Sequence, residues 1–310
     1  SDGGGPSAAI NVAENSTAVT TVTATDPDFP VQPLTFSISG GIDAARFTID
    51  ANTGALSFAV APDREAPSDA NSDNIYNVVV QVSDGTLIDS QSLAVTVTPV
   101  NDNTPTITSD ASGPTAALSV AENTSLVTTV TATDADLPGQ TLSYSITGGA
   151  DAARFSIDST TGVLSFIVAP NFEAPSDAGG NNVYDVTVQV SDGLNTDSQD
   201  IAVTVTAAND NAPVITSDGG GATATINVAE NTSGVTTLTA TDADLPGQTL
   251  SYSIVGGADA ASFTINVSTG ALSFTSAPDH EAPGDVGANN VYNVTVQVSD
   301  GTFTDTQAIA

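Results

Sequence analysis

The sequence lacks lysine, cysteine, methionine and tryptophan, and its 3 basic residues stand against 36 acidic ones. A net charge of −33 excludes electrostatic binding to nucleic acid or to an anionic membrane, because both require clustered basic side chains. The absence of cysteine excludes disulfides, thiolate zinc sites and cysteine nucleophiles. No apolar run approaches the roughly 20 residues that span a membrane, so we expect no membrane insertion.

The remaining composition favours a folded β protein. Apolar residues make up 39% of the chain and alternate regularly, which argues against disorder. Ser, Thr, Val, Ala, Gly and Asp dominate, and these residues favour strands and turns over helices. A charge so far from zero destabilises a compact state by self-repulsion unless counterions bind. The sequence therefore raises the question of what neutralises the acid.

The chain contains three tandem copies of one sequence repeat. Glu14, Glu122 and Glu230 each lie in a Val-Ala-Glu-Asn string, and successive copies are 108 residues apart. A period of this length corresponds to a whole domain, which indicates a tandem array. Because Ser1 aligns just after one linker and Ala310 just before a strand, we expect an excerpt from a longer array. The predicted domains are residues 1–102, 103–210 and 211–310, the third being truncated.

Each unit reads as β structure throughout. Apolar and polar residues alternate with period two in Tyr184–Val190, Ile201–Thr206 and Leu142–Ile146, and glycine-containing turns separate these runs. About seven short strands in a unit of this size predict an antiparallel Greek-key sandwich. The fold class is therefore all-β: three tandem, seven-stranded, immunoglobulin-like sandwiches. Ala150–Phe155 and its counterpart Asp43–Phe47 are compatible with one helical turn.

The carboxylates are not scattered. All six glutamates fall at two repeat positions, Glu14, Glu122, Glu230 and Glu65, Glu173, Glu281. Asp-Xaa-Asp and Asn-Asp-Asn strings recur beside them, and calcium prefers such carboxylate, amide and carbonyl oxygens. Zinc and copper are not expected, since His280 is the only imidazole. Solvated loops copied by duplication are the alternative interpretation.

Several linked motifs, in order, resemble the cadherin repeats in their bacterial cadherin-like form. The resemblance covers all three units. It rests on Val-Ala-Glu-Asn, the Asp-Ala-Asp of Asp134–Asp136, Phe155–Asp158 with Thr161–Leu164, the Asp-Arg-Glu of Asp63–Glu65, Tyr184–Gly193 and the linker Asn101–Pro105.

The resemblance implies about two or three calcium ions at each junction between consecutive repeats. The first junction would use Glu14, Asp63, Glu65, Asn101, Asp102, Asn103, Asp134, Asp136 and Asp192. The second would use Glu122, Asn171, Glu173, Asn209, Asp210, Asn211, Asp242, Asp244 and Asp300. Asp26, Asp28 and Asp84 would serve a preceding repeat, and Glu230, Asp279 and Glu281 a following one.

Three features depart from the family pattern. Pro99 and Ala207 stand where the family linker begins with an aspartate, which removes one carboxylate from each junction. Asn171 replaces the aspartate found at Asp63. The loop Ala66–Asn74 and its counterparts are longer than usual. Their Asp69, Asp73, Asp177 and Asp285 allow two interpretations, an extra metal or contact site or a solvated loop.

The functional prediction is mechanical: a calcium-rigidified array that acts as the adhesion or stalk region of a secreted or surface protein. Its partners would be calcium, neighbouring repeats and homotypic or lateral copies. A self-assembling filament, sheath or surface layer is the alternative, and a glycan-binding module is a third. An enzyme is not expected, because no nucleophile–base set recurs in the repeats. The absence of Lys, Cys and Trp points to a bacterial secreted protein.

Overall fold

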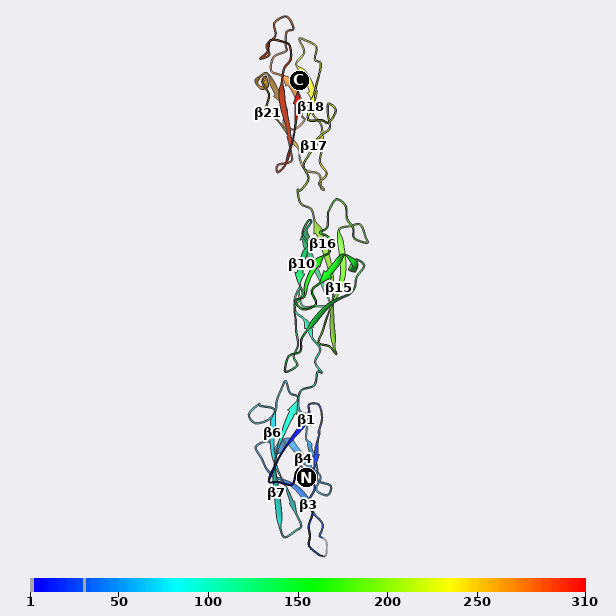
Figure 1. Cartoon of the computed structure of the whole chain (residues 1–310), viewed down its shortest axis with the longest axis vertical. Coiled ribbons are helices and arrows are strands. Elements are labelled where there is room, and N and C mark those ends of the chain that lie inside the picture. The colour runs from blue at the N-terminus through cyan, green and yellow to red at the C-terminus, as the bar shows by residue number, and fades with distance from the viewer. Residues whose placement is uncertain (1–2, 30–31) are drawn as a thin grey trace.

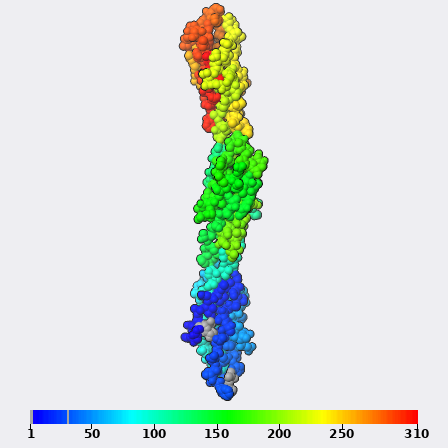
Figure 2. All heavy atoms as spheres, turned by 45° about the vertical axis from the view of Figure 1, so that its right-hand side comes forward, coloured from blue at the N-terminus to red at the C-terminus, as the bar shows by residue number. Residues whose placement is uncertain are grey.

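A computed structural model of the chain describes residues 3–29 and 32–310. Three β-sandwiches follow one another along a rod, with the N-terminal repeat at one end and the C-terminal repeat at the other (Figure 1). The space-filling view shows that successive repeats meet end to end (Figure 2). Side chains in the linkers and in the facing loops can therefore control the angle between repeats.

The first repeat is a sandwich of a four-stranded sheet, in the order β1-β7-β6-β3, and a three-stranded sheet, β2-β5-β4. One 3₁₀ turn, η1, joins the two sheets between β3 and β4. The elements are β1 (Ser7–Ala13), β2 (Ala18–Thr21), β3 (Thr35–Gly40), η1 (Ala44–Arg46), β4 (Phe47–Ile49), β5 (Ala55–Phe58), β6 (Ile75–Ser83) and β7 (Ile88–Thr98).

The second repeat has the same two sheets, β12-β15-β16-β9 and β10-β14-β13, and adds a short ladder between β8 and β11. Its elements are β8 (Thr106–Ile107), β9 (Thr115–Ala121), β10 (Leu126–Thr129), β11 (Ala132–Thr133), β12 (Ser143–Gly148), η2 (Ala152–Arg154), β13 (Phe155–Ile157), β14 (Val163–Phe166), β15 (Val183–Ser191) and β16 (Thr196–Thr206).

The third repeat has the sheets β18-β25-β24-β21 and β19-β23-β22 and the short ladder β17-β20. Its elements are β17 (Val214–Ile215), β18 (Thr223–Ala224), β19 (Gly234–Thr237), β20 (Ala240–Thr241), β21 (Ser251–Gly256), η3 (Ala260–Ser262), β22 (Phe263–Ile265), β23 (Ala271–Phe274), β24 (Val294–Ser299) and β25 (Thr304–Ile309). The predicted all-β class is confirmed, and the short helical turns coincide with η1 and η2.

One strand pair departs from the expected antiparallel pattern. β1 runs parallel to β7 over seven residue pairs, from Ser7 opposite Ser92 to Ala13 opposite Thr98. β9 and β16 repeat this arrangement. With an odd number of strands, the first and last run in the same direction, and the fold places them side by side. The chain therefore enters each repeat at one end and leaves at the other, as a linear array requires.

Each repeat has its own apolar core between the two sheets. In the second repeat, Phe155 and Phe166 stack with ring centroids 4.6 Å apart, and the Tyr184 ring meets Phe166 edge-on at 5.1 Å. The Tyr184 hydroxyl accepts the backbone amide of Ser176 at 3.1 Å. The core aromatic thus also anchors the long loop that carries Ser176.

The buried aspartates of the long loops bind backbone, which corrects the interpretation of these loops as merely solvated. Asp177 is buried, and its two carboxylate oxygens accept the amides of Asn181 and Asn182 at 2.9 and 3.0 Å. Asp151 holds the other side of the loop by accepting the amide of Ala178 at 2.6 Å. Asp69 and Asp285 are buried in the same way, whereas Asp73 is exposed. These carboxylates fix loop shape.

Candidate metal centre at the junctions between repeats

In the first and second repeats, the glutamate of the Val-Ala-Glu-Asn string lies directly after β1 and β9, next to the outgoing linker. Glu14 is 3% exposed; its Oε2 accepts the amide of Arg64 at 2.7 Å and its Oε1 that of Val100 at 2.6 Å. Glu122 makes the same contacts with the amides of Phe172 and Ala208. The parallel pairing of the first and last strands brings the glutamate to the linker. The side chain therefore ties a loop of its own repeat to the start of the linker.

Two acidic groups face each other at the first junction. Glu14, Glu65 and Asp102 bring carboxylate oxygens within 4.8 Å of one another, as do Asp134, Asp136 and Asp192 of the second repeat. The first group joins the first repeat to the linker, and the second caps the following sandwich. Predicted ligands from three separate segments are thus brought together.

The linker is hydrogen-bonded to the second repeat. Asn103 donates to Asp136 Oδ1 from its backbone amide at 3.1 Å and from its side-chain amide at 2.6 Å. The side chain of Asn195 donates to Asn101 Oδ1 and to the Asn103 carbonyl, both at 3.0 Å. These contacts place the Asn101 and Asn103 segment against the acidic end of the second repeat.

Direct contacts also cross the first junction from loop to loop. The Leu137 amide donates to Glu65 Oε1 at 2.9 Å, and Arg64 Nε donates to the Leu137 carbonyl at 3.0 Å. Arg64 also donates from Nη1 to the Val97 carbonyl at 2.6 Å. A single residue of the second repeat, Leu137, therefore binds two neighbouring side chains of the first.

The second junction repeats the carboxylate arrangement. Glu122, Glu173 and Asp210 form one acidic group, and the Leu245 amide donates to Glu173 Oε1 at 3.1 Å. Asn211 donates to Asp244 Oδ1 from its backbone at 3.1 Å and from its side chain at 2.6 Å. Asp242 and Asp300, two further predicted ligands of this junction, lie at the same end of the third repeat, where Asp242 Oδ1 accepts the Asp244 amide at 3.0 Å. Burial raises the pKa of Asp300, but hydrogen bonds from the Thr302 and Phe303 amides and from the linker residue Asn209 hold that pKa below its ordinary value.

The described residues contain 13 buried side-chain atoms without a hydrogen-bond partner, and eight of them belong to other side chains, such as Gln199 and Gln307. The other five belong to predicted ligands: Asp134 Oδ2 at the first junction and, at the second, Glu173 Oε2, Asn209 Oδ1, Asp242 Oδ2 and Asp300 Oδ2. A buried oxygen that accepts no hydrogen bond costs free energy. All are hard oxygen donors, the ligand type that calcium selects, so the residues present fit a calcium ion.

The pKa values of Asp136 and Glu65 are those of an acidic cluster that a cation would stabilise. Burial raises the pKa of Asp136, but hydrogen bonds from Asn103 and Gln140 outweigh it and hold that pKa below its ordinary value. Burial and the nearby charge of Glu14 raise the pKa of Glu65. Asp136 is therefore ionised at neutral pH, and the crowded Glu14 and Glu65 pair would gain from a cation between them.

Asp63 and its counterparts have a local role in the loop. Asp63 Oδ1 accepts the amides of Glu65 and Ala66 at 2.9 and 3.1 Å. Asn171 keeps this turn with its amide oxygen, which accepts the Ala174 amide at 2.8 Å. The exchange of aspartate for asparagine at Asn171 therefore preserves the loop while removing a negative charge.

Carboxylates also gather at both ends of the rod. Asp26, Asp28 and Asp84 form a group on the first repeat, and Glu230, Asp279 and Glu281 form one on the third. Glu230 is exposed, unlike its buried counterparts, although its Oε2 accepts the His280 amide at 2.9 Å. The same residue types are thus present where a neighbouring repeat could complete the site.

Sequence reasoning missed the side chains that hold the ligands in place. Asn15 donates to Asp102, and Asn123 donates to Asp210. Gln140 donates to Asp136 Oδ2 at 2.9 Å. The asparagine after each motif glutamate was a visible signal, whereas nothing in the sequence links Gln140 to a carboxylate four residues earlier.

The comparisons with known proteins agree with the geometry. A family model described as "Cadherin domain" matches residues 8–100, 116–207 and 224–309. Human Protocadherin Fat 1 is 29% identical over 307 residues, which cover 94% of this chain and 6% of that protein. Mouse Cadherin EGF LAG seven-pass G-type receptor 2 is 34% identical over 254 residues, covering 80% of this chain and 8% of that protein. The chain thus spans less than a tenth of these relatives.

Solved structures show the same fold. Mouse Cadherin-23 EC22-24 superposes with a TM-score of 0.63 at 22% identity, covering 99% of this chain and 95% of that one. Human CDH23 EC21-23 gives a TM-score of 0.66 at 20% identity, with 98% of both chains covered. These relatives are animal proteins, so they do not support the bacterial source expected from composition.

These findings also settle the general class of protein. Within the described residues, no helix is long and apolar enough to cross a membrane. Cadherin ectodomain repeats are extracellular, belong to a non-enzymatic adhesion family and bind calcium at inter-domain junctions. The chain consists of three tandem cadherin domains and belongs to the cadherin family.

Proposed function

We propose that the chain is the calcium-stiffened stalk or adhesion region of a secreted or surface protein. The observation that carries the proposal is the convergence of partnerless buried oxygens, from Glu173, Asn209, Asp242 and Asp300, at one junction. These oxygens come from two repeats and the linker between them. A site assembled from three segments forms only when the segments are held in one relative position.

At the first junction, Glu14, Glu65 and Asp102 would hold calcium on one side and Asp134, Asp136 and Asp192 on the other; Asp63, Asn101 and Asn103 would complete the set. At the second junction the corresponding set is Glu122, Asn171, Glu173, Asn209, Asp210, Asn211, Asp242, Asp244 and Asp300. The two acidic groups at the first junction favour about two ions, and Pro99 and Ala207 remove the carboxylate expected for a further one.

Bound calcium supplies positive charge and takes six to eight oxygen ligands. The chain supplies a pre-arranged linker: Asn103 fastened to Asp136, and Leu137 fastened to Glu65. Linkage then favours the straight junction, by about 2.7 kcal/mol when calcium is at 100 times its dissociation constant. Extracellular modules bind calcium at roughly 10⁻⁴ to 10⁻³ M, so such a junction is sensitive to millimolar calcium.

Small-angle scattering with and without chelator tests the proposal. We expect a maximum dimension that shortens, and a broader distance distribution, after calcium removal. Asp134→Ala should shift the calcium midpoint to higher concentration, whereas Asp200→Ala, an exposed carboxylate on β16 away from the junction, should not. An unchanged scattering profile in chelator would overturn the proposal.

Side-to-side assembly is the second candidate. Val60 and Val168 occupy the same position in the first and second repeats and are 80% and 79% exposed, whereas the third repeat has Ser276 there, so an exposed apolar residue recurs in two of the three repeats. The proposal of a filament or sheath depends on such recurrence. Ile42 is 73% exposed, but the equivalent positions in the other two repeats are the alanines Ala150 and Ala258. The lateral surfaces of the three repeats are therefore not identical. Electron microscopy in calcium would separate single rods from ordered fibres.

A further inference from the structure

The three-stranded sheet of the second repeat carries exposed apolar side chains on its outer face. Leu126 on β10 is 54% exposed, and Ile167, directly after β14, is 62% exposed. The equivalent residues of the other repeats are smaller or polar: Ala18 and Ala59 in the first, and Gly234 and Thr275 in the third. The second repeat thus differs from its neighbours on this face.

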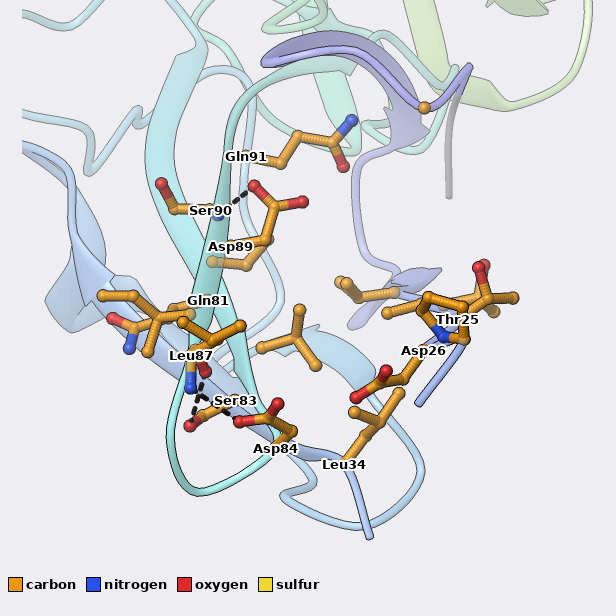
Figure 3. A pocket seen from close by; sticks show the side chains of 18 of the residues that line it. Thr25, Asp26, Leu34, Gln81, Ser83, Asp84, Leu87, Asp89, Ser90 and Gln91 are labelled. Carbon is orange, nitrogen blue, oxygen red and sulfur yellow. Dashed lines mark hydrogen bonds between the residues drawn. The ribbon is translucent and has the colours of Figure 1, made fainter. Parts of the chain in front are cut away.

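A different apolar surface, the groove of the first repeat, is part of the sandwich itself. It lies between the Asp84 to Gln91 segment and the segment that carries Thr25 and Asp26 (Figure 3). At the equivalent place in the second repeat, Ile107 of β8 is 2% exposed and belongs to the core. The outer face around Leu126, in contrast, lies outside the core of its repeat.

Strand register places a row of side chains across the middle of this outer face. Ser165 of β14 pairs with Leu126 of β10 on one side and with Ser156 of β13 on the other. The neighbours of Ser165 along β14, Leu164 and Phe166, are buried in the core. Because side chains alternate along a strand, Ser165 and its two cross-strand partners point outward. One leucine and two small serines form this central row.

Apolar and charged side chains flank the central row at two residues' distance along each strand. The Ile167 amide donates to the Arg154 carbonyl at 2.8 Å, so these residues are neighbours on one side of the row. The Asp158 amide donates to the Val163 carbonyl at 3.0 Å, so these two are neighbours on the other side. One side therefore combines isoleucine with arginine, and the other combines valine with aspartate.

This arrangement is complementary to itself. A two-fold axis along the central row turns a second copy over, so that the row meets its own counterpart. Arg154 of one copy then faces Asp158 of the other, and Ile167 faces Val163. Each of these contacts occurs twice, and Leu126 and the two serines meet their own copies at the axis. The serines are small, so the two sheets can approach closely.

Opposite charges make this face suitable for a contact between two strongly acidic chains. Each chain carries a net charge of −33, so approach is unfavourable wherever carboxylates meet. Arg154, one of the 3 basic residues, is exposed here and offers a positive charge to a second copy. Asp158 Oδ1 accepts the amides of Thr160 and Thr161 at 3.0 and 2.8 Å, which leaves Oδ2 to accept the guanidinium.

We propose that this outer face of the second repeat, centred on Leu126, Ser165 and Ser156, binds the same face of a second copy of the chain. The strands run roughly along the rod (Figure 1), so an axis across them makes the two rods antiparallel. The inference rests on the side-to-side candidate of the proposed function and gives that candidate a specific contact. It is independent of calcium stiffening, because the whole face belongs to one repeat.

Crosslinking of the full chain tests the contact, since the chain has no cysteine of its own. Ser156→Cys places a thiol at the axis. Thr264→Cys, at the equivalent position of the third repeat, is the matched control. Facing sheets lie about 10 Å apart, so a short bis-maleimide is used to join the two thiols. We expect it to link two copies of the Ser156→Cys variant several-fold faster than two copies of the Thr264→Cys variant.

Removing the charges by copying the third repeat tests the predicted pairing. Arg154→Ser and Asp158→Asn reproduce that repeat, where Asn266 Oδ1 keeps the same turn by accepting two backbone amides. Together they should slow crosslinking of the Ser156→Cys variant about 2- to 30-fold, because two exposed ion pairs are lost. Ile167→Thr should slow it as well. An unchanged melting temperature of the second repeat confirms that these variants fold.

Equal crosslinking rates for Ser156→Cys and Thr264→Cys would overturn the proposal, and would mean that this face serves a different partner or none. An unchanged rate after removal of both charges would also overturn it. Ordered fibres together with equal rates would leave side-to-side assembly to another surface. Failure of the calcium-stiffened stalk is read separately, from an unchanged scattering profile in chelator, and it leaves the crosslinking rates as expected.

Discussion

The motif glutamate has a structural role that is separable from metal binding, and Glu122→Gln tests it. Each carboxylate oxygen of Glu122 accepts one backbone amide, from Phe172 at 2.8 Å and from Ala208 at 2.7 Å. The side chain is 3% exposed, so water cannot replace either contact. Glutamine keeps the shape but turns one acceptor into an NH₂ group. One of the two amides must therefore lose its partner.

The expected cost follows from that lost contact. A hydrogen bond to a charged group contributes about 1.5–3 kcal/mol, so we expect about 2 kcal/mol of destabilisation in the second repeat. This loss speeds hydrogen exchange at globally protected amides about 30-fold, since each 1.4 kcal/mol is tenfold. The amides of Val188 and Val203, both completely buried, are suitable reporters. The measurement is made in chelator, so that calcium contributes nothing.

Glu230→Gln is the matched control. Glu230 is exposed and accepts the His280 amide through Oε2, so a glutamine can turn its carbonyl oxygen to the same donor. We expect less than about 0.5 kcal/mol in the third repeat, as for other surface changes. Equal exchange rates in chelator for Glu122→Gln and the unaltered chain would refute the reasoning, because the glutamate would then act through calcium alone.

Three further outcomes are expected. Gly162→Ala should lower the melting temperature of the second repeat in calorimetry by several degrees, about 4–8 °C per kcal/mol; its Cβ would lie 2.1 Å from the Val130 carbonyl oxygen at a φ of 71°. Asp177 has a pKa held below its ordinary value, because backbone amides outweigh the effect of burial. The ionised carboxylate of Asp177 therefore stabilises the second repeat above about pH 4, and this stabilisation is lost as the pH falls through the folded pKa. Urea unfolding at pH 7 and pH 3 measures the loss in free energy of unfolding, and Asp177→Asn should remove the contribution of Asp177 to it. In chelator, Arg64→Phe, which copies Phe172, should broaden spin-label distances across the first junction to the width seen at the second; an unchanged width would contradict a bracing role for Arg64.

Much of the fold was predictable because its information is local. Alternation in Tyr184–Val190 predicted a strand that the structure extends over Val183–Ser191. The run Ile201–Thr206 lies within β16, and Leu142–Ile146 overlaps β12, which begins at Ser143. A period of two needs only neighbouring residues to decide which face is buried. The same alternation is present in all three repeats, which strengthens the prediction of each strand.

The remaining features depend on contacts between distant residues. The parallel pairing of β1 with β7 joins residues about 85 positions apart, and alternation is the same for either strand direction. The buried Asp177 resembles any loop aspartate in the sequence, since its amide partners come from the folded loop. Asn195 reaches Asn101 across a junction, and only the assembled rod brings them together. The predicted ligands were easier to find, because duplication repeated them.

The parallel pairing of the first and last strands determines how a repeat bears tension along the array. Tension on the array enters a repeat through β1 and leaves through β7, so it pulls the two strands past each other along their length. Their registered pairs, Ser7 opposite Ser92 through Ala13 opposite Thr98, then share the load at the same time. In an antiparallel hairpin pulled from its open end, the pairs would break one after another. The same ladder between β9 and β16 also has seven registered pairs, so the first and second repeats are both built to resist shear along the axis of the rod.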